Sequence, residues 1–573
     1  MDYKSEYNRW LKKAADAELR AELERMDEKT VEDAFYRDLA FGTGGLRGII
    51  GAGTNRMNIH VVARASQGLS EYLLSTASPD AVEHGNVSVV IGYDSRIKSD
   101  VFAKTAAGVL AANGIIAHFW PELNPVPTVS FAVRELRASA GVMITASHNP
   151  SQYNGYKVYG ADGCQITTQA ATEIFSCISA LDIFSDVRSM NFDTAVAMGK
   201  IKYIEASALT SFIGAVKRQS VLFGDEINHD VAIVYSPLNG TGLKPVTRVL
   251  KESGFTNITV VEEQRLPDGN FPTCPYPNPE IREAMELGLK YAADTGADLL
   301  LATDPDADRC GVAVRTSIGD YQLLSGNEVG LLLLDFICSQ RMKHNRMPKS
   351  PVFVKTIVTT DLAETIAKSY GVETINVLTG FKFIGEVIGK LEAQGRASDY
   401  ICGFEESYGY LTGTYVRDKD AVNAAYTICE MFAYYKTYGI SLLQKLEDIY
   451  KTYGYCLNTL HSYGFSGSSG MEKMRRIMNS FRVGLDALGG EQIVRTEDYS
   501  KGLNGLPKAN VLKYYYESSE SEIGSGGSGS VVIRPSGTEP KLKAYISVTS
   551  KDRESAEEVE SRIRASIEQK IMG

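Results

Sequence analysis

From residue 86 onward, short apolar runs alternate with longer segments whose apolar residues recur every three or four positions. Short apolar runs are typical of buried strands, and the three-to-four spacing is typical of amphipathic helices, so their alternation predicts α/β layering. In the first domain, which we end near residue 205, the predicted strands are 86–94, 115–120 and 139–147, and the predicted helix is 99–114.

The alternation starts again twice. A second domain over 206–320 is predicted from strands 230–240, 258–263, 297–304 and 311–315 and helices 244–254 and 280–296. A third over 321–450 is predicted from helices 327–342 and 420–439, strands 351–358 and 374–379, and the segment 399–407. Both domains repeat the strand and helix lengths of the first, so we expect them to be α/β domains as well.

The last part of the chain has a different pattern. Strands are predicted at 456–464, 510–517, 530–535 and 542–550, with helices at 470–488 and 552–571. The glycine- and serine-rich stretch 524–530 is expected to be a flexible hairpin loop. We therefore predict four domains, bounded as 1–205, 206–320, 321–450 and 451–573, of which the last is a smaller α+β unit.

Length and composition agree with this division. A chain of 573 residues makes roughly four domains of about 150 residues each. The formal charge of -10 argues against a broad basic surface for nucleic acid, so anionic ligands are expected in local basic pockets. The 8 cysteines form no CxxC pair, which favours reduced thiols in the cytoplasm. We expect no signal peptide, because the N-terminal segment is charged and helical in pattern. We expect no membrane span, because the longest apolar run, near residues 329–338, is short and contains Asp335.

The first polar loop that follows a predicted strand is TASHNPSQYNGYKVYG, residues 145–160. A serine that caps a turn is the simple explanation for Ser147 taken alone. A serine-hydrolase elbow is excluded, because Thr145 and Asn149 stand where that motif needs glycine. His148 is expected to be a poor base for Ser147, since adjacent side chains on extended backbone point apart.

The second loop is TDPDADRCG, residues 303–311, between two predicted strands. Asp304, Asp306 and Asp308 alternate, so a bend at Pro305 lets three carboxylates converge on one hard cation such as Mg²⁺. A calcium EF-hand is excluded because strands flank the loop and Arg309 occupies the position that needs glycine. The alternative is an exposed acidic turn without metal.

The third and fourth loops carry groups suited to sugars and phosphates. GFEESYGY, residues 403–410, offers acids and a serine to sugar hydroxyls, and Lys382 and Lys419 are candidate phosphate ligands, although a solvated turn explains these residues equally well. In IRPSGTEPKLKAY, residues 533–545, a guanidinium, two hydroxyls and a free backbone N–H make a phosphate cradle, with a hairpin turn as the alternative.

Two glycine-rich nucleotide sites are excluded. FGTGGLRG, residues 41–48, has Arg47 where a dinucleotide fingerprint needs glycine, and no strand is predicted before it. The sequence contains no P-loop.

Taken together, TASHNP, DPDADR, GFEES and RPSGTEPK, in that order, resemble the four signature loops of the α-D-phosphohexomutase superfamily. The resemblance extends from residue 41 to residue 541. It implies four domains around a central cleft, the first three α/β with mixed sheets and the last α+β. One departure is that DPDADR replaces the commoner DGDGDR, and the stiffer Pro305 and Ala307 put the geometry of that loop in question.

The resemblance also assigns roles to single residues. It implies that Ser147 is a phosphoserine and, with Asp304, Asp306 and Asp308, a ligand of one Mg²⁺. The residues that match the phosphoryl-transfer site are Arg47, His148, Lys157 and Arg309, with Lys157 as a candidate general acid or base. The expected substrate-binding residues are Thr379, Gly380, Lys382, Glu405, Ser407 and Lys419, and the expected distal phosphate clamp is Arg534, Ser536, Gly537 and Thr538.

The implied reaction moves a phosphoryl group between Ser147 and a hexose monophosphate through a bisphosphate. GFEES resembles the glucose-type members and their pentose relatives, so we expect glucose 1-phosphate and glucose 6-phosphate to be interconverted, with glucose 1,6-bisphosphate as activator. Pentose or mannose phosphates are the alternatives, and an inactive sugar-phosphate-binding homologue is the alternative from another class. We expect a monomer or homodimer in the cytoplasm that binds neither nucleic acid nor membrane.

Overall fold

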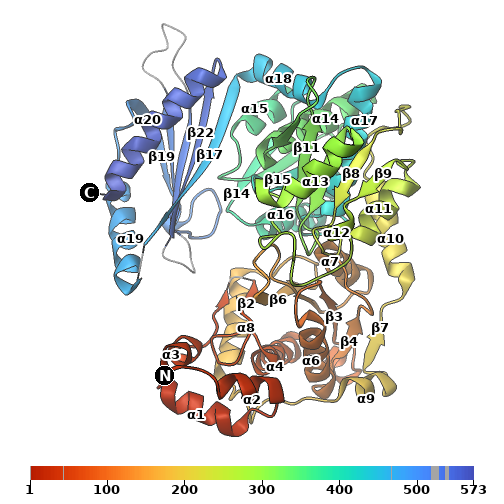
Figure 1. Ribbon diagram of the computed structural model, residues 1–573, viewed down its shortest axis with the longest axis vertical. Helices are drawn as coiled ribbons and strands as arrows, with labels where there is room; N and C mark the ends of the chain where they lie inside the picture. Colours follow the sequence, from red (N-terminus) through yellow and green to blue (C-terminus); the bar gives the residue numbers. More distant parts are fainter. Residues whose placement is uncertain (1, 43, 466, 518–527, 536–540, 573) are drawn as a thin grey trace.

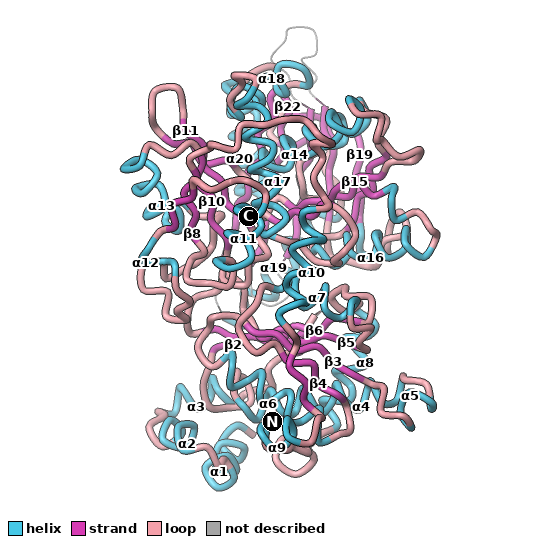
Figure 2. The backbone as a smooth tube through the Cα atoms, turned by 90° about the vertical axis from the view of Figure 1, so that its right-hand side faces the viewer, coloured by secondary structure: helices cyan, strands magenta, loops and turns pink. Residues whose placement is uncertain are grey.

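The structure is a computed structural model that describes residues 2–42, 44–465, 467–517, 528–535 and 541–572. Its strands form four separate sheets (Figure 1). The sheet nearest the N-terminus lies at the bottom of the picture, the next two lie above it, and the last lies at the upper left. Seen from the side, the first sheet and its helices lie below the other three sheets (Figure 2). The predicted fold class, three α/β units and one α+β unit, is confirmed.

The first sheet has the order β1-β2-β6-β5-β3-β4-β7 and mixes parallel and antiparallel pairs. Its strands are β1 (Phe41–Gly42), β2 (Gly45–Ile49), β3 (Ser88–Tyr93), β4 (Ile116–Phe119), β5 (Ala140–Ile144), β6 (Tyr153–Gly160) and β7 (Ile201–Tyr203). The helices are α1 (Tyr3–Lys13), α2 (Ala17–Leu23), α3 (Glu28–Phe35), α4 (Ile59–Thr76), α5 (Pro79–Glu83), α6 (Ser99–Ala112), α7 (Val126–Glu135), α8 (Thr168–Ala180) and α9 (Phe192–Ala197).

Helices cover both faces of this sheet. Val89 and Ile91 of β3 pack into the core that contains α4, α6 and α8, whereas Val90 packs into the smaller core that contains α7. Because side chains alternate across a strand, a strand covered on both sides is apolar throughout, which is why 86–94 was predictable.

The second sheet has the order β12-β11-β10-β8-β9 and the third has the order β14-β13-β15-β16. The second comprises β8 (Ile233–Ser236), β9 (Ile258–Val260), β10 (Leu299–Thr303), β11 (Cys310–Arg315) and β12 (Tyr321–Leu324), with α10 (Ala206–Lys217), α11 (Leu243–Glu252), α12 (Glu262–Arg265) and α13 (Arg282–Thr295). The third comprises β13 (Val352–Thr356), β14 (Glu373–Val377), β15 (Tyr400–Glu405) and β16 (Gly409–Thr412), with α14 (Gly326–Lys343), α15 (Leu362–Ser369), α16 (Phe381–Ala393), η1 (Ala397–Asp399), α17 (Ala421–Thr437) and α18 (Leu442–Tyr453).

The second and third units share one hydrophobic core. Phe212 and Val249 of the second unit belong to the same cluster of buried residues as Phe353 and Ile428 of the third. The second sheet also reaches Leu324, past the boundary expected at residue 320. The boundaries at residues 205, 320 and 450 stay predictions.

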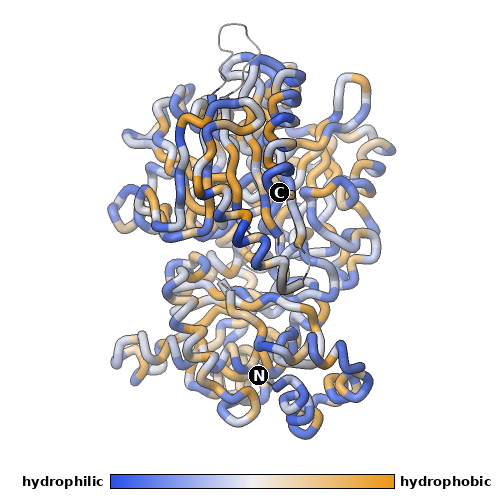
Figure 3. The backbone as a smooth tube through the Cα atoms, turned by 90° about the vertical axis from the view of Figure 1, so that its left-hand side faces the viewer, coloured by the Kyte–Doolittle hydropathy of each residue, from blue (hydrophilic) through white to orange (hydrophobic). Residues whose placement is uncertain are grey.

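The fourth sheet is antiparallel throughout, in the order β17-β22-β21-β20-β19-β18. Its elements are β17 (Tyr455–Gly464), α19 (Gly467–Arg482), β18 (Ala487–Leu488), β19 (Glu491–Asp498), η2 (Tyr499–Lys501), β20 (Leu512–Glu517), β21 (Ser528–Pro535), β22 (Lys541–Ser550) and α20 (Arg553–Met572). The two helices pack their apolar residues against the sheet. The strands of this unit show many apolar positions in Figure 3.

Several local expectations need correction. Residues 153–160 form strand β6 rather than the second half of a loop, and the polar segment 491–498 forms strand β19. Residues 528–530 begin strand β21, whereas the rest of the expected hairpin loop 524–530 lies outside the described residues. Strand 258–263 stops at Val260, and helix α12 follows it.

Within the described residues, none of the helices combines the length and apolar character needed to cross a bilayer.

Candidate functional site

The loop that carries Ser147 follows β5, at the carboxyl end of a central strand. Ser147 has a left-handed backbone with φ 52°, and its N–H donates to Thr145 Oγ1 at 2.8 Å. Ser147 Oγ donates to Asp304 Oδ2 at 2.9 Å and lies 3.1 Å from His148 Nδ1. The expectation that His148 points away from Ser147 was therefore wrong, because it assumed extended backbone at Ser147.

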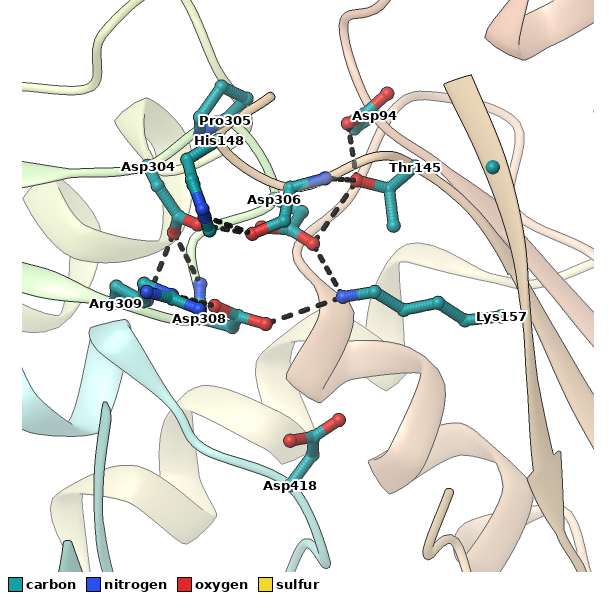
Figure 4. A network of polar contacts seen from close by, with 12 residues as sticks. Asp94, Thr145, His148, Lys157, Asp304, Pro305, Asp306, Asp308, Arg309 and Asp418 are labelled. Carbon is teal, nitrogen blue, oxygen red and sulfur yellow. Dashed lines mark hydrogen bonds and ion pairs between the residues drawn. The ribbon is translucent and has the colours of Figure 1, made fainter. Parts of the chain in front are cut away.

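Arg96 and Asp94, which the sequence analysis did not single out, support this loop. The guanidinium of Arg96 donates to the carbonyl oxygens of Ser147, Asn149, Pro150 and Tyr153. Asp94 Oδ2 accepts from Thr145 Oγ1 at 2.6 Å (Figure 4). Both residues follow strand β3, next to β5, and that position at the carboxyl ends of parallel strands is the signal that could have identified them.

The second loop joins β10 to β11 and brings three buried carboxylates together. One oxygen of each of Asp304, Asp306 and Asp308 lies within 4.8 Å of the others. Asp304 Oδ1 accepts the backbone N–H groups of Asp308 at 3.0 Å and Arg309 at 2.9 Å, which turns the loop back on itself. Ala307 takes a left-handed backbone with φ 48°, so the loop bends at that residue as well as at Pro305.

The second unit itself and the first unit hold the outer side of this loop. Thr241 donates to the carbonyl oxygen of Pro305 from both its backbone N–H and its hydroxyl, each at 2.9 Å. The Val126 N–H donates to the carbonyl oxygen of Asp306 at 2.9 Å. A Cβ on Gly240 would lie 2.4 Å from Pro305 Cα, so the two backbones meet directly.

Two lysines balance the carboxylates. Lys157 Nζ, which projects from β6, lies 2.9 Å from Asp306 Oδ2 and 3.4 Å from Asp308 Oδ2 (Figure 4). Lys419 Nζ lies 2.9 Å from Asp308 Oδ2. Burial opposes the charge on Lys157, but Asp306 and Asp308 outweigh it and raise its pKa. The ammonium form of Lys157 is therefore the stable one in this cluster.

The donor set suits a hard divalent cation. Asp306 Oδ1 and Asp308 Oδ1 are buried and have no hydrogen-bond partner among the described atoms. Burial, followed by the charges of Asp306 and Asp308, raises the pKa of Asp304 well above its usual range. Unpartnered carboxylate oxygens that repel one another are what an oxygen-binding ion such as Mg²⁺ would stabilise.

His148 and Arg309 stand at the edge of the triad. Burial, with the positive charges of Arg309 and Arg47, lowers the pKa of His148 well below its usual value, so the imidazole is neutral. Arg309 pairs with Glu280, a residue absent from the sequence-based site. Arg47 lies on β2 and donates to Asn149 Oδ1 at 3.1 Å, which places it beside the serine loop.

A cavity of about 460 Å³ opens beside the triad and is lined by all four units. Of the expected residues, those that line it are His148, Arg309, Thr379, Ser407 and Arg534. A larger and more open hollow of about 690 Å³ lies on the first unit beside α4 and α6, but none of the expected site residues lines it. The cavity beside the triad is thus the candidate substrate site.

Of the expected sugar-binding residues, Thr379 and Ser407 line the cavity, whereas Gly380, Lys382, Glu405 and Lys419 do not. Thr379 Oγ1 is buried without a partner among the described atoms, and Glu405 Oε1 accepts from the Gly380 N–H at 3.0 Å. Burial raises the pKa of Glu405 to about 7. Lys382 lies on α16 over the Phe383 ring and does not line the cavity.

The phosphate clamp is described only in part. Arg534 lies near the end of β21 and lines the cavity, opposite Lys543 of β22 in the sheet register. Ser536, Gly537 and Thr538 lie outside the described residues.

Four family models match consecutive parts of the chain. They are described as phosphoglucomutase/phosphomannomutase alpha/beta/alpha domain I at residues 38–183, domain II at 210–319 and domain III at 325–453, and the C-terminal domain at 494–566. The chain belongs to the phosphoglucomutase/phosphomannomutase family. The resemblance inferred from the four loops is confirmed.

Curated relatives within this family are similar over nearly the whole chain. A phosphoglucomutase of Staphylococcus saprophyticus is 35% identical over 551 residues, covering 94% of this chain and 96% of the relative. A phosphoglucomutase of Staphylococcus aureus is 34% identical over 555 residues, covering 95% of each chain.

Solved structures show the same fold. The parafusin phosphoglucomutase from Paramecium, in its open form, matches with a TM-score of 0.68 at 16% identity, covering 93% of this chain and 95% of that one. A phosphoglucomutase/phosphomannomutase family protein from Burkholderia thailandensis matches with a TM-score of 0.65 at 16% identity, covering 93% of this chain and 98% of that one.

Proposed function

We propose that this protein is a phosphoglucomutase that interconverts glucose 1-phosphate and glucose 6-phosphate. The observation that carries the proposal is the hydrogen bond of 2.9 Å between Ser147 Oγ and Asp304, one of three clustered buried aspartates beside the cavity. The curated relatives at 34% and 35% identity support glucose as the sugar.

In this proposal Asp304, Asp306, Asp308 and an oxygen on Ser147 hold one Mg²⁺. When bound, the ion would offset the negative charge on the phosphoryl group that is transferred. Lys157 and Lys419 also offset the negative charge of these carboxylates, and they do so whether or not a metal ion is bound.

Each half-reaction exchanges one oxygen–phosphorus bond for another. The bond between Ser147 Oγ and phosphorus breaks while a bond forms between phosphorus and the free hydroxyl oxygen of the sugar, which gives glucose 1,6-bisphosphate. The sugar hydroxyl loses a proton and Ser147 Oγ gains one, and the second half-reaction reverses both changes with the other phosphate. Lys157, held protonated by two aspartates, is the proposed proton carrier: its ammonium gives a proton to Ser147 Oγ, and the resulting amine takes the proton that the sugar hydroxyl loses. Neutral His148 is proposed to orient Ser147 Oγ.

The rest of the cavity is proposed to bind the sugar and its second phosphate. Glu405, Ser407, Thr379 and Gly380 are proposed to bind hydroxyls, and Arg534, with Ser536, Gly537 and Thr538 from the same loop, is proposed to bind the distal phosphate. A guanidinium holds phosphate by charge and paired hydrogen bonds, so it can accept either end of the bisphosphate. Lys382, like Gly380, Glu405 and Lys419, does not line the cavity itself.

The proposal also includes an activator and a location in the cell. Glucose 1,6-bisphosphate is proposed as the activator, because it can phosphorylate Ser147 when the phosphoserine has been lost. All eight cysteines are free thiols, which supports a cytoplasmic location.

The test is a series of kcat/KM measurements on glucose, mannose, ribose and deoxyribose 1-phosphates, with Mg²⁺ and glucose 1,6-bisphosphate present. The glucose substrate should give the highest value. A higher value for mannose or a pentose would overturn the glucose assignment. Failure of peptide mass mapping to find phosphate on Ser147 after incubation with the bisphosphate would overturn the mechanism.

A further inference from the structure

A single carboxylate of the third unit is bonded to two neighbouring strands of the fourth. Asp361, just before helix α15, accepts from Lys513 Nζ of β20 at 2.8 Å through Oδ1 and from Ser530 Oγ of β21 through Oδ2. Lys513 also donates to the Ile357 carbonyl oxygen at 3.0 Å. The loop 357–361 therefore holds both strands at one point.

The charges around Asp361 make this contact strong. Lys355, fully buried on β13, lies 3.2 Å from Asp361 Oδ1 and 3.0 Å from Glu364 Oε1. Burial opposes ionisation of Asp361, but Lys513 and Lys355 outweigh it and hold the pKa of that carboxyl well below its usual range. Asp361 is thus stabilised as an anion by two buried lysines, and its loss would leave Lys513 without an ion-pair partner among the described residues.

Strand β21 connects this contact to the substrate cavity. Ser530, Val532 and Arg534 alternate along the strand, so they project from one face, and all three line the cavity. Arg534 lies four residues beyond Ser530, about 13 Å along an extended strand. Fixing Ser530 therefore fixes the direction in which the strand presents Arg534.

The same loop contacts the sugar-binding segment on its other side. Thr356 Oγ1 and Thr359 Oγ1 lie 2.8 Å apart and reach Glu406 Oε2 at 3.4 and 3.3 Å. Glu406 follows Glu405 at the end of β15 and lines the cavity. Loop 357–361 is thus in contact with a wall of the sugar site and with the strand that carries the phosphate ligand.

We propose that Asp361 is a positioning residue that sets the distance between the sugar-binding loop and Arg534 by holding β21. The inference rests on the proposed function, in which Arg534 binds the distal phosphate. An apolar cluster that includes Ile357, Val358 and Val532 also joins the two units, so they stay in contact when Asp361 is replaced. Replacement is therefore expected to loosen β21 rather than to release the whole fourth unit.

The first readout is amide hydrogen exchange without substrate. Asp361→Asn should raise exchange in β20 and β21 by about tenfold, the effect of losing roughly one charge-assisted hydrogen bond. Asp335→Asn is the control, because Asp335 is a carboxylate that likewise combines a lysine ion pair, with Lys445, and a hydroxyl hydrogen bond, from Tyr370, but it touches no strand of the fourth unit among the described contacts. Equal exchange in the two variants would overturn the proposal.

The second readout is a kinetic cycle with Arg534. Asp361→Asn should raise KM for glucose 1-phosphate about tenfold with a smaller change in kcat. In the Arg534→Ala background, Asp361→Asn should change KM little, because Arg534, the residue that Asp361 positions, is already absent. Independent, multiplicative effects would mean that Asp361 does not act through Arg534 and would overturn the inference.

A third variant and one further outcome complete the test. Ser530→Ala removes the contact to β21 without stranding a charge, so it decides the exchange experiment if Asp361→Asn does not fold. Unchanged kinetics in Arg534→Ala would overturn the proposed phosphate clamp, and with it the kinetic role of Asp361, even if the exchange data showed that Asp361 holds β21.

Discussion

At the scale of single residues, the site depends on which charged groups share a small buried volume. Asp304, Asp306 and Asp308 are each at most 1% exposed, so their charges are not screened by water. Lys157 and Lys419 pair with Asp306 and Asp308, whereas Asp304 accepts hydrogen bonds from Ser147 and from backbone N–H groups. Substitution of Asp306 or Asp308 therefore removes an ion pair with a lysine, whereas substitution of Asp304 removes hydrogen bonds.

Ser147→Ala should abolish turnover and leave the fold intact. The hydroxyl is the proposed phosphoryl acceptor, while its hydrogen bond to Asp304 is worth only about 1 kcal/mol of stability. The measurements are kcat and the thermal midpoint. Ser66→Ala is the control, because Ser66 is a buried serine of the first unit that bonds to the Val62 carbonyl and Tyr156, and this variant should turn over normally. Turnover near the unmodified level in Ser147→Ala would refute the mechanism.

Asp304→Asn should separate metal binding from folding. Without metal, burial and the charges of Asp306 and Asp308 oppose ionisation of Asp304, so a neutral amide at this position should not lower the thermal midpoint in chelator. With Mg²⁺, the unmodified protein should be stabilised by mass action and the variant should not. The control is Asp298→Asn, because Asp298 directly precedes strand β10, whereas Asp304 directly follows it, and Asp298 pairs with Lys436. This variant should keep the rise of the thermal midpoint on addition of Mg²⁺. A full rise in Asp304→Asn would exclude this residue as a ligand.

At the scale of elements, the serine loop is held by the two strands beside it. A Cβ on Gly155 of β6 would lie 2.5 Å from the Thr145 carbonyl oxygen and 2.8 Å from that of Leu46. No side chain fits between β2, β6 and the start of the serine loop. The position of Ser147 is therefore tied to the close approach of three backbone segments.

Gly155→Ala should lower both stability and turnover. Overpacking at a contact between backbones costs roughly 1 to 3 kcal/mol, and relief would displace the segment that leads to Ser147. Gly464→Ala is the comparison, since no described atom lies within 4 Å of the added Cβ at that strand position. Chemical unfolding and kcat should show a loss in the first variant and little change in the second. Equal behaviour of the two would show that the close approach does not control the site.

The sequence predicted strands best where a run of apolar residues is enough to identify them. Strands β3, β5 and β10 are mostly apolar and were found, and so were the polar loops that follow β5 and β10. Strand β6 was missed because its Asn154, Gly155 and Lys157 suggest a loop, and their partners, such as the Ile97 carbonyl for Asn154, are distant in sequence. The roles of Glu280 and Asp361 could not be predicted for the same reason, since each depends on a partner that only the folded chain supplies.

At the scale of the whole molecule, the second and third units behave as one body with a shared core. Glu430 of α17 is 3% exposed and accepts from Ser220 Oγ of the second unit at 2.7 Å. Burial raises the pKa of Glu430 to about 7, against a smaller opposing effect of its hydrogen bonds. The junction therefore contains a carboxyl that is protonated in the folded protein at mildly acidic pH.

Stability should fall as pH rises through this window. Between pH 4.5 and about 7 the folded state binds the Glu430 proton more tightly than the unfolded state does, so raising the pH costs up to about 3 kcal/mol. Glu430→Gln should be as stable as the unmodified protein at pH 5 and more stable at pH 8, by thermal midpoint. Glu447→Gln, an exposed change on α18, should show no such difference. A Glu430→Gln effect independent of pH would refute the raised pKa.

The hydrogen bonds from Thr241 and Val126 to the loop 304–309 also affect how fast a metal ion can bind. Thr241 and Val126 fix the carbonyl oxygens of Pro305 and Asp306 whether or not a cation is present, so the carboxylates are presented in place beforehand. We therefore expect the loop to coordinate a cation without refolding. The rate of Mg²⁺ uptake should then be set by how reluctantly the ion sheds its own water, and manganese, whose hydration shell exchanges faster, should load sooner at equal concentration.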